Sequence, residues 1–428
     1  IINVLKYTSN IFILLSTKER NGLMNAKDKK IIGLYSSNLF IYLLAGGIYY
    51  GIFVVFLSSV KGFSTDEISL ISSIPPLVML AVSPLWGKII DKSKRLIHLT
   101  KLVTIANALT IIILVFTNNF WLFFIIAIAG SCLYAPSTSL MSEYLLAIEK
   151  KTGYPFGKVR VWGAIGYAIS GLISPVFIDL WGTTGALLIC GFIMLSTVII
   201  LQFIPELTTG ENEEQIKNNL KAQKNDINAK EILFSLLKNK PFLIQLFATN
   251  VIMATCNSTS NYSIQVILEK LSCPTSLIST VPFIMVVMEI VFLFIFHKLP
   301  FAKKSYLATF TALVILCFRW YFMASIPNYM FLLLLMLVHG VVVGIMMPVQ
   351  NNLIAELVPT KQQSTAFLFE VVVVPTIFSS ILNLFTGYLS VYTGISIFGY
   401  TYLILSIIAL VIIIPSFLKE SRTKKSFC

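Results

Sequence analysis

The chain has 428 residues, of which 57% are hydrophobic and only 12% are charged. A soluble domain usually carries about 25% charged residues, so this composition excludes an ordinary soluble domain and indicates an integral membrane protein in a lipid bilayer. The formal net charge of +13 is typical of lysine in cytoplasmic loops. It does not predict nucleic-acid binding, because no basic stripe is interleaved with aromatic residues.

The first residues are set apart from the fold prediction. Met24 opens the sequence MNAKDKK immediately before the first long apolar segment. The earlier run IFILL is too short to cross a bilayer, and no small-residue cleavage site follows it. We therefore leave out residues 1–23 and expect residues 1–30 to form an N-terminal cytoplasmic lead.

Twelve apolar segments follow, each close to or longer than the roughly 20 residues that a helix needs to cross a bilayer. Inside a bilayer the backbone must satisfy its own hydrogen bonds, so these segments are expected to be helices. The predicted segments are 31–59, 67–86, 96–117, 120–145, 156–180, 184–205, 242–268, 275–297, 305–325, 328–357, 364–391 and 394–418.

Lysine and arginine are concentrated in alternate connections between these segments. The basic connections lie at 27–30, 88–95, 150–158, 206–240, 298–304, 361 and 419–425, whereas the opposite connections contain only Lys61 and Lys270. Positive charge favours the cytoplasmic side, which predicts a multi-pass plasma-membrane protein with both termini in the cytoplasm.

A polar stretch divides the segments into six and six. Residues 206–240 contain ENEEQIKNNLKAQKNDINAK and are predicted to be a cytoplasmic linker. It separates an N-terminal six-helix bundle (31–205) from a C-terminal one (241–418), which is followed by a cytoplasmic tail (419–428). Two such halves are typical of transporters whose site lies where the halves meet.

The connection after the second segment reads Gly87-Lys-Ile-Ile-Asp91-Lys92-Ser-Lys94-Arg95. It resembles the signature loop between helices two and three of the major facilitator superfamily. The resemblance implies the all-α major facilitator fold, with twelve transmembrane helices in two six-helix bundles. Gly87, Asp91, Lys92 and Arg95 would then form a conformational latch. The alternative is an ordinary basic loop, and residues 296–304 of the second half keep the basic residues but lack the Gly and Asp.

The start of the fifth segment, Phe156-Gly157-Lys-Val-Arg160-Val-Trp162-Gly163-Ala-Ile-Gly166-Tyr167, resembles the matching stretch of the lactose permease group. That resemblance implies an arginine that binds substrate hydroxyls and an aromatic ring that stacks on substrate, here Arg160 and Tyr167. They are seven residues apart and so share a helix face. Tyr167 stands where the group has a stacking Trp, which weakens a prediction of galactosides as substrates. The alternative to substrate binding by Arg160 is that it is a basic residue at the cytoplasmic membrane surface. Tyr49 matches an aromatic lining position, with packing or interfacial anchoring as its alternative.

Glu289, Arg319 and His339 each lie near the middle of a long apolar segment. A charge at bilayer depth costs roughly 2.5–3.5 kcal/mol on insertion scales, so such residues usually face a cavity or one another. We interpret the three as one site on a substrate and proton pathway. A permanent Glu289–Arg319 ion pair, or a packing role for His339, is the alternative.

The lactose permease group also carries Glu, Arg and His in helices eight, nine and ten, although the local sequence is more similar to the phenylpropionate permease-like group. Val342 stands where lactose permease has a second acid, and Ser139 is nearest to its helix-four carboxylate, with Glu143 one turn on. Glu289 is therefore the expected proton carrier, with Arg319 and His339 assisting it.

The seventh segment carries polar residues at intervals of seven, four and four, which predicts one polar helix face; these residues are Asn250, Asn257, Asn261 and Gln265. We expect Asn257 and Asn261 to contact substrate, with polar helix–helix contacts as the alternative. Glu370, about two turns inside the eleventh segment, is interpreted as a cytoplasmic-side gate partner or as a residue that faces the interface.

The sequence shows no Walker loop, nucleophile triad or metal-ligand spacing, so we expect neither an enzyme nor an ATP-driven pump, and no cofactor besides the proton gradient. The predicted function is secondary active transport, by proton-coupled uptake of a small organic solute such as a sugar, a nucleoside or an aromatic acid. An exporter of drugs or metabolites and a transport-dead membrane sensor are the alternatives. We expect a monomer.

Overall fold

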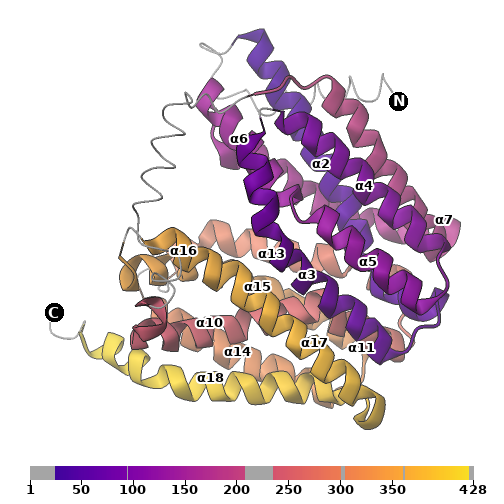
Figure 1. Cartoon of the computed structure of the whole chain (residues 1–428). Coiled ribbons are helices and arrows are strands. Elements are labelled where there is room, and N and C mark those ends of the chain that lie inside the picture. Colours follow the sequence, from indigo (N-terminus) through magenta and orange to yellow (C-terminus); the bar gives the residue numbers. More distant parts are fainter. Residues whose placement is uncertain (1–24, 94, 208–234, 300–303, 360–361, 424–428) are drawn as a thin grey trace. The chain divides into compact units, whose positions relative to one another are not determined.

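A computed structural model describes residues 25–93, 95–207, 235–299, 304–359 and 362–423, which are almost entirely helical (Figure 1). Much of the predicted lead and most of the predicted linker lie outside the described residues. The chain divides into two compact units. Unit 1 comprises Ile1–Gly62, Ile74–Gln215 and Thr275–Phe283, and unit 2 comprises Phe63–Ser73, Ile216–Pro274 and Ile284–Cys428.

The helices of the first half follow the predicted segments closely. They are α2 (Ala26–Val55, continued by a π-helical turn at Phe56–Val60), α3 (Thr65–Lys92), α4 (Leu96–Phe116), α5 (Phe120–Tyr134), α6 (Ser137–Thr152) and α7 (Phe156–Gln202). The predicted fourth segment is two helices, because the turn before Pro136 separates α5 from α6.

The predicted fifth and sixth segments are joined in α7, which is broken at Gly182. This residue has φ 68° and ψ 175°, a conformation that a residue without a Cβ adopts most readily. The two limbs of α7 therefore correspond to two predicted segments.

The second half is also helical throughout its described part. Its elements are α10 (Lys240–Ser258), a π-helical turn (Thr259–Ser263), α11 (Ile264–Lys270), α12 (Thr275–Ile278), α13 (Val281–Ile295), α14 (Ser305–Ser325), α15 (Tyr329–Leu357), α16 (Gln363–Leu368), a second π-helical turn (Phe369–Val373), α17 (Val374–Thr393) and α18 (Ser396–Thr423). Asparagine side chains cap several helices, as where Asn239 Oδ1 accepts from Phe242 N at 3.2 Å at the start of α10.

Ten helices among the described residues are long and apolar enough to cross a membrane. This number counts α7 once, although Gly182 interrupts it. The stretch Lys240–Lys270, which is rich in Asn, Thr and Ser, is not among the ten. These lengths and compositions fit a multi-pass membrane protein.

Glycines allow α2 and α7 to pack closely in unit 1. A Cβ on Gly166 would collide with the Phe40 carbonyl oxygen, and one on Gly163 would lie 3.6 Å from Leu43 Cγ. Small residues at such contacts are typical of helix packing inside bilayers. The first limb of α7 is thus fixed against α2.

Each unit contains a carboxylate that caps the first turn of a helix distant in sequence. In unit 1 the Glu206 carboxylate accepts hydrogen bonds from Ile97 N at 2.9 Å and His98 N at 2.8 Å, at the start of α4. In unit 2 Glu420 accepts from Leu307 N at 2.9 Å and Tyr306 N at 3.3 Å, at the start of α14. A residue just after the sixth predicted segment thus caps the third, and a residue just after the twelfth caps the ninth, so each half contains the same kind of cap.

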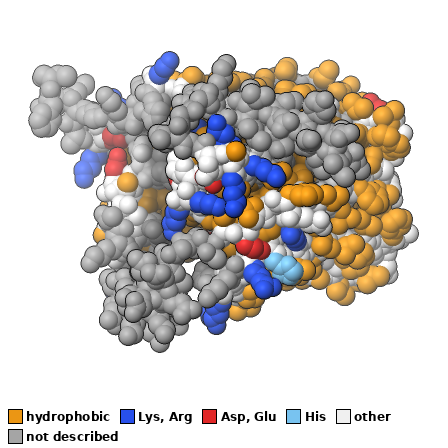
Figure 2. All heavy atoms as spheres, turned by 90° about the horizontal axis from the view of Figure 1, so that it is seen from above, with side chains coloured by type: hydrophobic (Ala, Val, Ile, Leu, Met, Phe, Trp, Pro, Cys, Tyr) orange, Lys and Arg blue, Asp and Glu red, His pale blue; other side chains and the backbone are white. Residues whose placement is uncertain are grey.

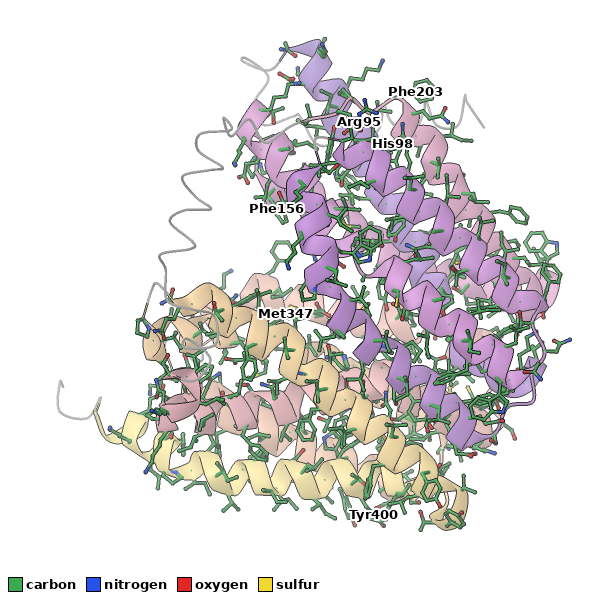
Figure 3. The ribbon with its side chains drawn as sticks, in the orientation of Figure 1. Arg95, His98, Phe156, Phe203, Met347 and Tyr400 are labelled. Carbon is green, nitrogen blue, oxygen red and sulfur yellow. The ribbon has the colours of Figure 1, made fainter. Side chains whose placement is uncertain are left out.

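This capped end of unit 1 is also charged. Arg95, His98 and Phe203 lie there together (Figure 3), and Lys88, Lys92 and Arg95 are exposed. Seen from above, Lys and Arg side chains gather on this face beside a flank covered by hydrophobic side chains (Figure 2). A charged end next to an apolar flank is typical of a protein that crosses a bilayer.

Candidate functional site

The centre of the candidate site is a buried arginine in unit 2. Arg319, on α14, is 1% exposed. Its Nη1 lies 3.9 Å from Cys256 Sγ, and its Nη2 lies 3.5 Å from Met336 Sδ. Its guanidinium carbon lies 4.3 Å from the ring centroid of Trp320. Sulfur atoms and an aromatic face are soft, neutral partners.

The Arg319 guanidinium lacks a counter-charge in the part of the chain that the structure describes. No carboxylate of those residues lies within ion-pair distance, and Nε has no hydrogen-bond partner. A buried charge without an opposite charge costs several kcal/mol. Arg319 is thus prepared to accept an anion or a polar ligand oxygen.

His339, on α15, contacts this arginine as the sequence pattern predicts. Its Nδ1 lies 3.5 Å from Arg319 Nη1, and the side chain is 6% exposed. Because the guanidinium only donates, Nδ1 must carry the lone pair and accept. The structure therefore brings together two of the three predicted proton-coupling residues.

Glu289, the third, lies on α13 at a close approach to α15. A Cβ on Gly340 would lie 2.7 Å from Glu289 N, and one on Gly344 would lie 2.7 Å from Glu289 O. The Glu289 carboxylate is partly buried and makes no ion pair with Arg319. Among the described residues it has no hydrogen-bond partner, so the alternative of a permanent Glu289–Arg319 pair is wrong for this structure.

The substrate residues predicted in the first half all lie in unit 1 but differ in exposure. Arg160 is exposed at the start of α7, and Tyr167 is partly buried two turns further on. Tyr49 is partly buried and stacks on Phe53 with ring centroids 4.5 Å apart. Arg160 has no partner among the described residues, which leaves its guanidinium available to a ligand.

The single polar face predicted for the seventh segment is wrong. A π-helical turn at Thr259–Ser263 lies between Asn257 and Gln265, and its extra residue shifts the helical register after it. Asn250 and Gln265 are buried, Asn257 is partly buried and Asn261 is exposed. Of the four side chains, Asn257 and Asn261 are the two that a ligand can reach.

The predicted latch is described only in part. Gly87 and Lys92 lie at the end of α3, and Arg95 precedes α4. Lys92 and Arg95 are exposed, and among the described residues no neighbouring helix lies within 4 Å of a Cβ placed on Gly87. The side chain of Asp91 lies outside the described residues, so the latch stays a prediction.

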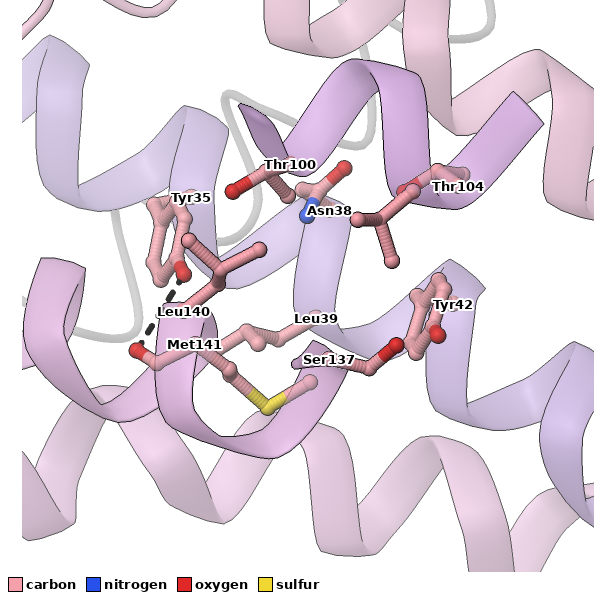
Figure 4. A pocket seen from close by; sticks show the side chains of 10 residues that line it. Tyr35, Asn38, Leu39, Tyr42, Thr100, Thr104, Ser137, Leu140 and Met141 are labelled. Atoms are coloured by element: carbon pink, nitrogen blue, oxygen red, sulfur yellow. Dashed lines mark hydrogen bonds between the residues drawn. The ribbon is translucent and has the colours of Figure 1, made fainter. Parts of the chain in front are cut away.

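A small cavity with both polar and apolar lining lies inside unit 1, and none of the predicted substrate residues lines it (Figure 4). It has a volume of about 20 Å³, enough for a water molecule. It is lined by Tyr35, Asn38, Leu39, Tyr42, Thr100, Val103, Thr104, Ser137, Leu140 and Met141. Tyr35 Oη donates to the Met141 carbonyl oxygen at 3.3 Å, and Asn38 Oδ1 has no protein partner. The cavity suits a structural water rather than an organic substrate.

A buried cluster surrounds Glu370, whose hydrogen-bond partners were not predicted. Glu370, in the π-helical turn Phe369–Val373, is 0% exposed. Gln245 and Thr249 of α10 donate to its Oε1, the latter at 3.0 Å. The signal that could have found the cluster was an acid in an apolar run, but its partners lie more than 100 residues away in the sequence.

No group of three or more His, Cys, Asp or Glu suited to a metal ion occurs among the described residues.

Comparison with known proteins identifies the family. The model of the MFS_1 like family matches residues 34–373. The uncharacterized transporter YwbF of Bacillus subtilis (strain 168) is 23% identical over 348 residues, which are 81% of each chain. Maltose permease of Geobacillus stearothermophilus is 22% identical over 337 residues, 76% of this chain and 79% of the permease.

An efflux protein is among the relatives over a shorter range. Multidrug resistance protein MdtG of Proteus mirabilis (strain HI4320) is 25% identical over 183 residues, 42% of each chain. In structure, the nucleoside transporter NupG matches with a TM-score of 0.71 at 15% identity, covering 91% of this chain and 98% of NupG. At that identity the likeness establishes the fold alone. The chain therefore belongs to the MFS_1 like family and is a multi-pass membrane transporter of the major facilitator type.

Proposed function

We propose that this transporter takes up a small organic solute together with protons, by alternating access between two six-helix bundles with twelve spans in all. The observation that carries the proposal is Arg319, which is buried beside His339 with no acid within ion-pair distance among the described residues. A permanent structural arginine at this depth would be expected to keep a carboxylate partner. An arginine that changes partners during a transport cycle needs no permanent carboxylate partner.

Glu289 supplies the exchangeable partner in this proposal. It lies on α13, whose backbone approaches α15 next to His339. When Glu289 is protonated, it is neutral and leaves Arg319 to a substrate oxygen. When Arg319 approaches Glu289, the positive charge favours the carboxylate and releases the proton. Substrate and the ionised Glu289 carboxylate therefore compete for one guanidinium, so protonation of Glu289 favours substrate binding and couples the two movements.

The proposed substrate is a sugar, a nucleoside or an aromatic acid. The maltose permease relative and the fold shared with a nucleoside transporter support polar, ring-shaped solutes. Arg160, Tyr49, Tyr167, Asn257 and Asn261 are the proposed contacts. Exposed guanidinium and amide groups can bind hydroxyls, and aromatic rings can stack on a sugar or base.

The test is proton movement driven by substrate in proteoliposomes or de-energised cells. A solute from the three classes is first found by counterflow, and its addition is expected to make the external medium more alkaline. Glu289→Gln, which mimics the neutral acid, should keep counterflow and lose uphill accumulation. Glu356→Gln, at an exposed position of α15, is the matched control. Uptake of the solute without any proton movement would refute symport and leave the fold assignment intact.

The second candidate function is efflux of drugs or metabolites, which the MdtG relative supports. Drug exporters commonly carry hydrophobic cations, and a buried, uncompensated Arg319 repels such cargo. Drug tolerance of cells with and without the protein separates the two functions. Increased tolerance that depends on Glu289 would favour export over uptake.

We further propose a plasma-membrane location for a monomer with both termini in the cytoplasm. The exposed Lys88, Lys92 and Arg95 at the capped end of unit 1 support this orientation. A membrane-impermeant lysine reagent should modify this end only after the cells are opened. Modification in intact cells would reverse the proposed orientation.

A further inference from the structure

The carboxyl group of Glu370 is enclosed within unit 2 by neutral partners. Gln245 and Thr249, four residues apart on α10, donate to Oε1, and Gln350 of α15 faces the same carboxyl group. No other titratable or charged side chain of the described residues faces it from α10, α15, α16 or α17. An ionised carboxylate here would therefore be a buried charge without a counter-charge.

Hydrogen bonding in this cluster is incomplete in a specific way. Glu370 Oε2, Gln245 Oε1 and Gln350 Nε2 are all buried without a partner. Each orphaned group is unfavourable, because it has lost its hydrogen bonds to water without gaining one in the protein. A proton on Oε2 removes the net charge and turns this orphaned acceptor into a donor. A glutamine amide carries an acceptor oxygen as well as a donor nitrogen. Rotation of a neighbouring glutamine amide by half a turn can therefore present its oxygen to that proton.

Apolar packing closes the cluster towards the end of unit 2 where α10 begins. Leu246 follows Gln245, Phe369 precedes Glu370, and both belong to a hydrophobic group with Phe242, Ile354 and Val358. Within the described residues, this layer contributes to the complete burial of the Glu370 side chain, which is 0% exposed. A proton can arrive along a transient file of water molecules and needs no large opening.

From this geometry we propose that Glu370 is a second proton-binding site, separate from Glu289, and that it holds its proton in the conformation seen here. Gln245 and Thr249 hold Oε1, and the proton resides on Oε2. The site lies in a π-helical turn at the junction of α16 and α17, a place where the helix can change its hydrogen bonding locally. The inference does not depend on symport, because it concerns the protein without substrate.

The test is infrared spectroscopy of the purified full-length protein without substrate. The Glu289→Gln background removes the carboxyl group of the other proposed proton site. A carbonyl band of a protonated carboxyl group is expected at neutral pH, and it should vanish in Glu289→Gln/Glu370→Gln and persist in Glu289→Gln/Glu356→Gln. Gln245→Leu removes a donor that favours the anion, so the band should persist to higher pH. If Gln245 had only a structural role, its replacement would not change the pH at which half of the band is lost.

A hydrophobic carbodiimide provides the second measurement, since it modifies protonated carboxyl groups. Peptide mass spectrometry of the wild-type protein should find an adduct on Glu370 that decreases at alkaline pH, with little on the exposed Glu356. If neither the band nor the adduct is present from mildly acidic to neutral pH, the proposal is overturned. A band that disappears when sodium replaces choline at constant pH would also overturn it, in favour of an alkali-cation site.

Discussion

Replacement of Arg319 by Met should make the transporter more stable and inactive. The side chain is 1% exposed and has no carboxylate within ion-pair distance among the described residues. Removing a poorly compensated buried charge is worth about 1–4 kcal/mol. The change sacrifices the contact with the Trp320 ring, about 1 kcal/mol, and the hydrogen bond to His339, also about 1 kcal/mol. Because no opposite charge pairs with Arg319 among the described residues, the upper part of that range applies, about 3–4 kcal/mol, and the expected net gain is about 1–2 kcal/mol.

The assay compares thermal unfolding of the purified variants with uptake by proteoliposomes. Lys298→Met removes a positive charge from an exposed position of unit 2 and is the matched control, expected to shift stability by less than about 0.5 kcal/mol. Arg319→Met should unfold at a higher temperature than both and transport at background rate. A clear loss of stability would show that the guanidinium is a structural group with a compensating partner, and would refute the reasoning.

Three further predictions concern other parts of the fold. Glu206→Ala should destabilise the protein by about 1–2 kcal/mol in thermal unfolding, because two amides at the start of α4 lose their acceptor. Glu420→Ala should do the same for α14, and the cap assignment fails if either variant unfolds like the wild type. Gly340→Ala should abolish uptake, because its Cβ would collide with the backbone of α13. Gly46→Ala, which has open space around its Cβ, should transport normally. Equal uptake by the two variants would contradict the close approach of α13 and α15. Burial raises the pKa of the Cys273 thiol to about 11, from an ordinary value of about 8.5. Because the thiolate is the reacting form, alkylation at pH near 8 should be on the order of 100-fold slower in the folded protein than after denaturation. Equal rates measured by mass spectrometry would disprove that burial.

The membrane-spanning helices could largely be predicted from the sequence because the apolar segments and their polar boundaries are strong local signals. The predicted segment 305–325 coincides with α14, and 328–357 differs from α15 by one residue. The break at Gly182 falls between the predicted segments 156–180 and 184–205. The π-helical turn at Thr259–Ser263 was harder to predict, because it leaves no mark in the hydropathy pattern.

The candidate site was predictable where it rests on rare residues. An arginine and a histidine in apolar segments pointed to the contact that Arg319 and His339 make. The Glu370 cluster depends instead on Gln245 and Thr249, residue types that also occur at many other helix positions. Only the packing of α10 against the helices around Glu370 selects these two, and that packing is a property of the tertiary structure.

The π-helical turns have a mechanical consequence for the seventh and eleventh predicted segments. Each turn accommodates one surplus residue within an otherwise regular helix. If that residue migrates along the axis, every side chain it passes rotates by roughly 100°, the angular step of an α-helix. Both segments can thus rotate a few side chains about the helix axis while the two ends of each segment keep their positions.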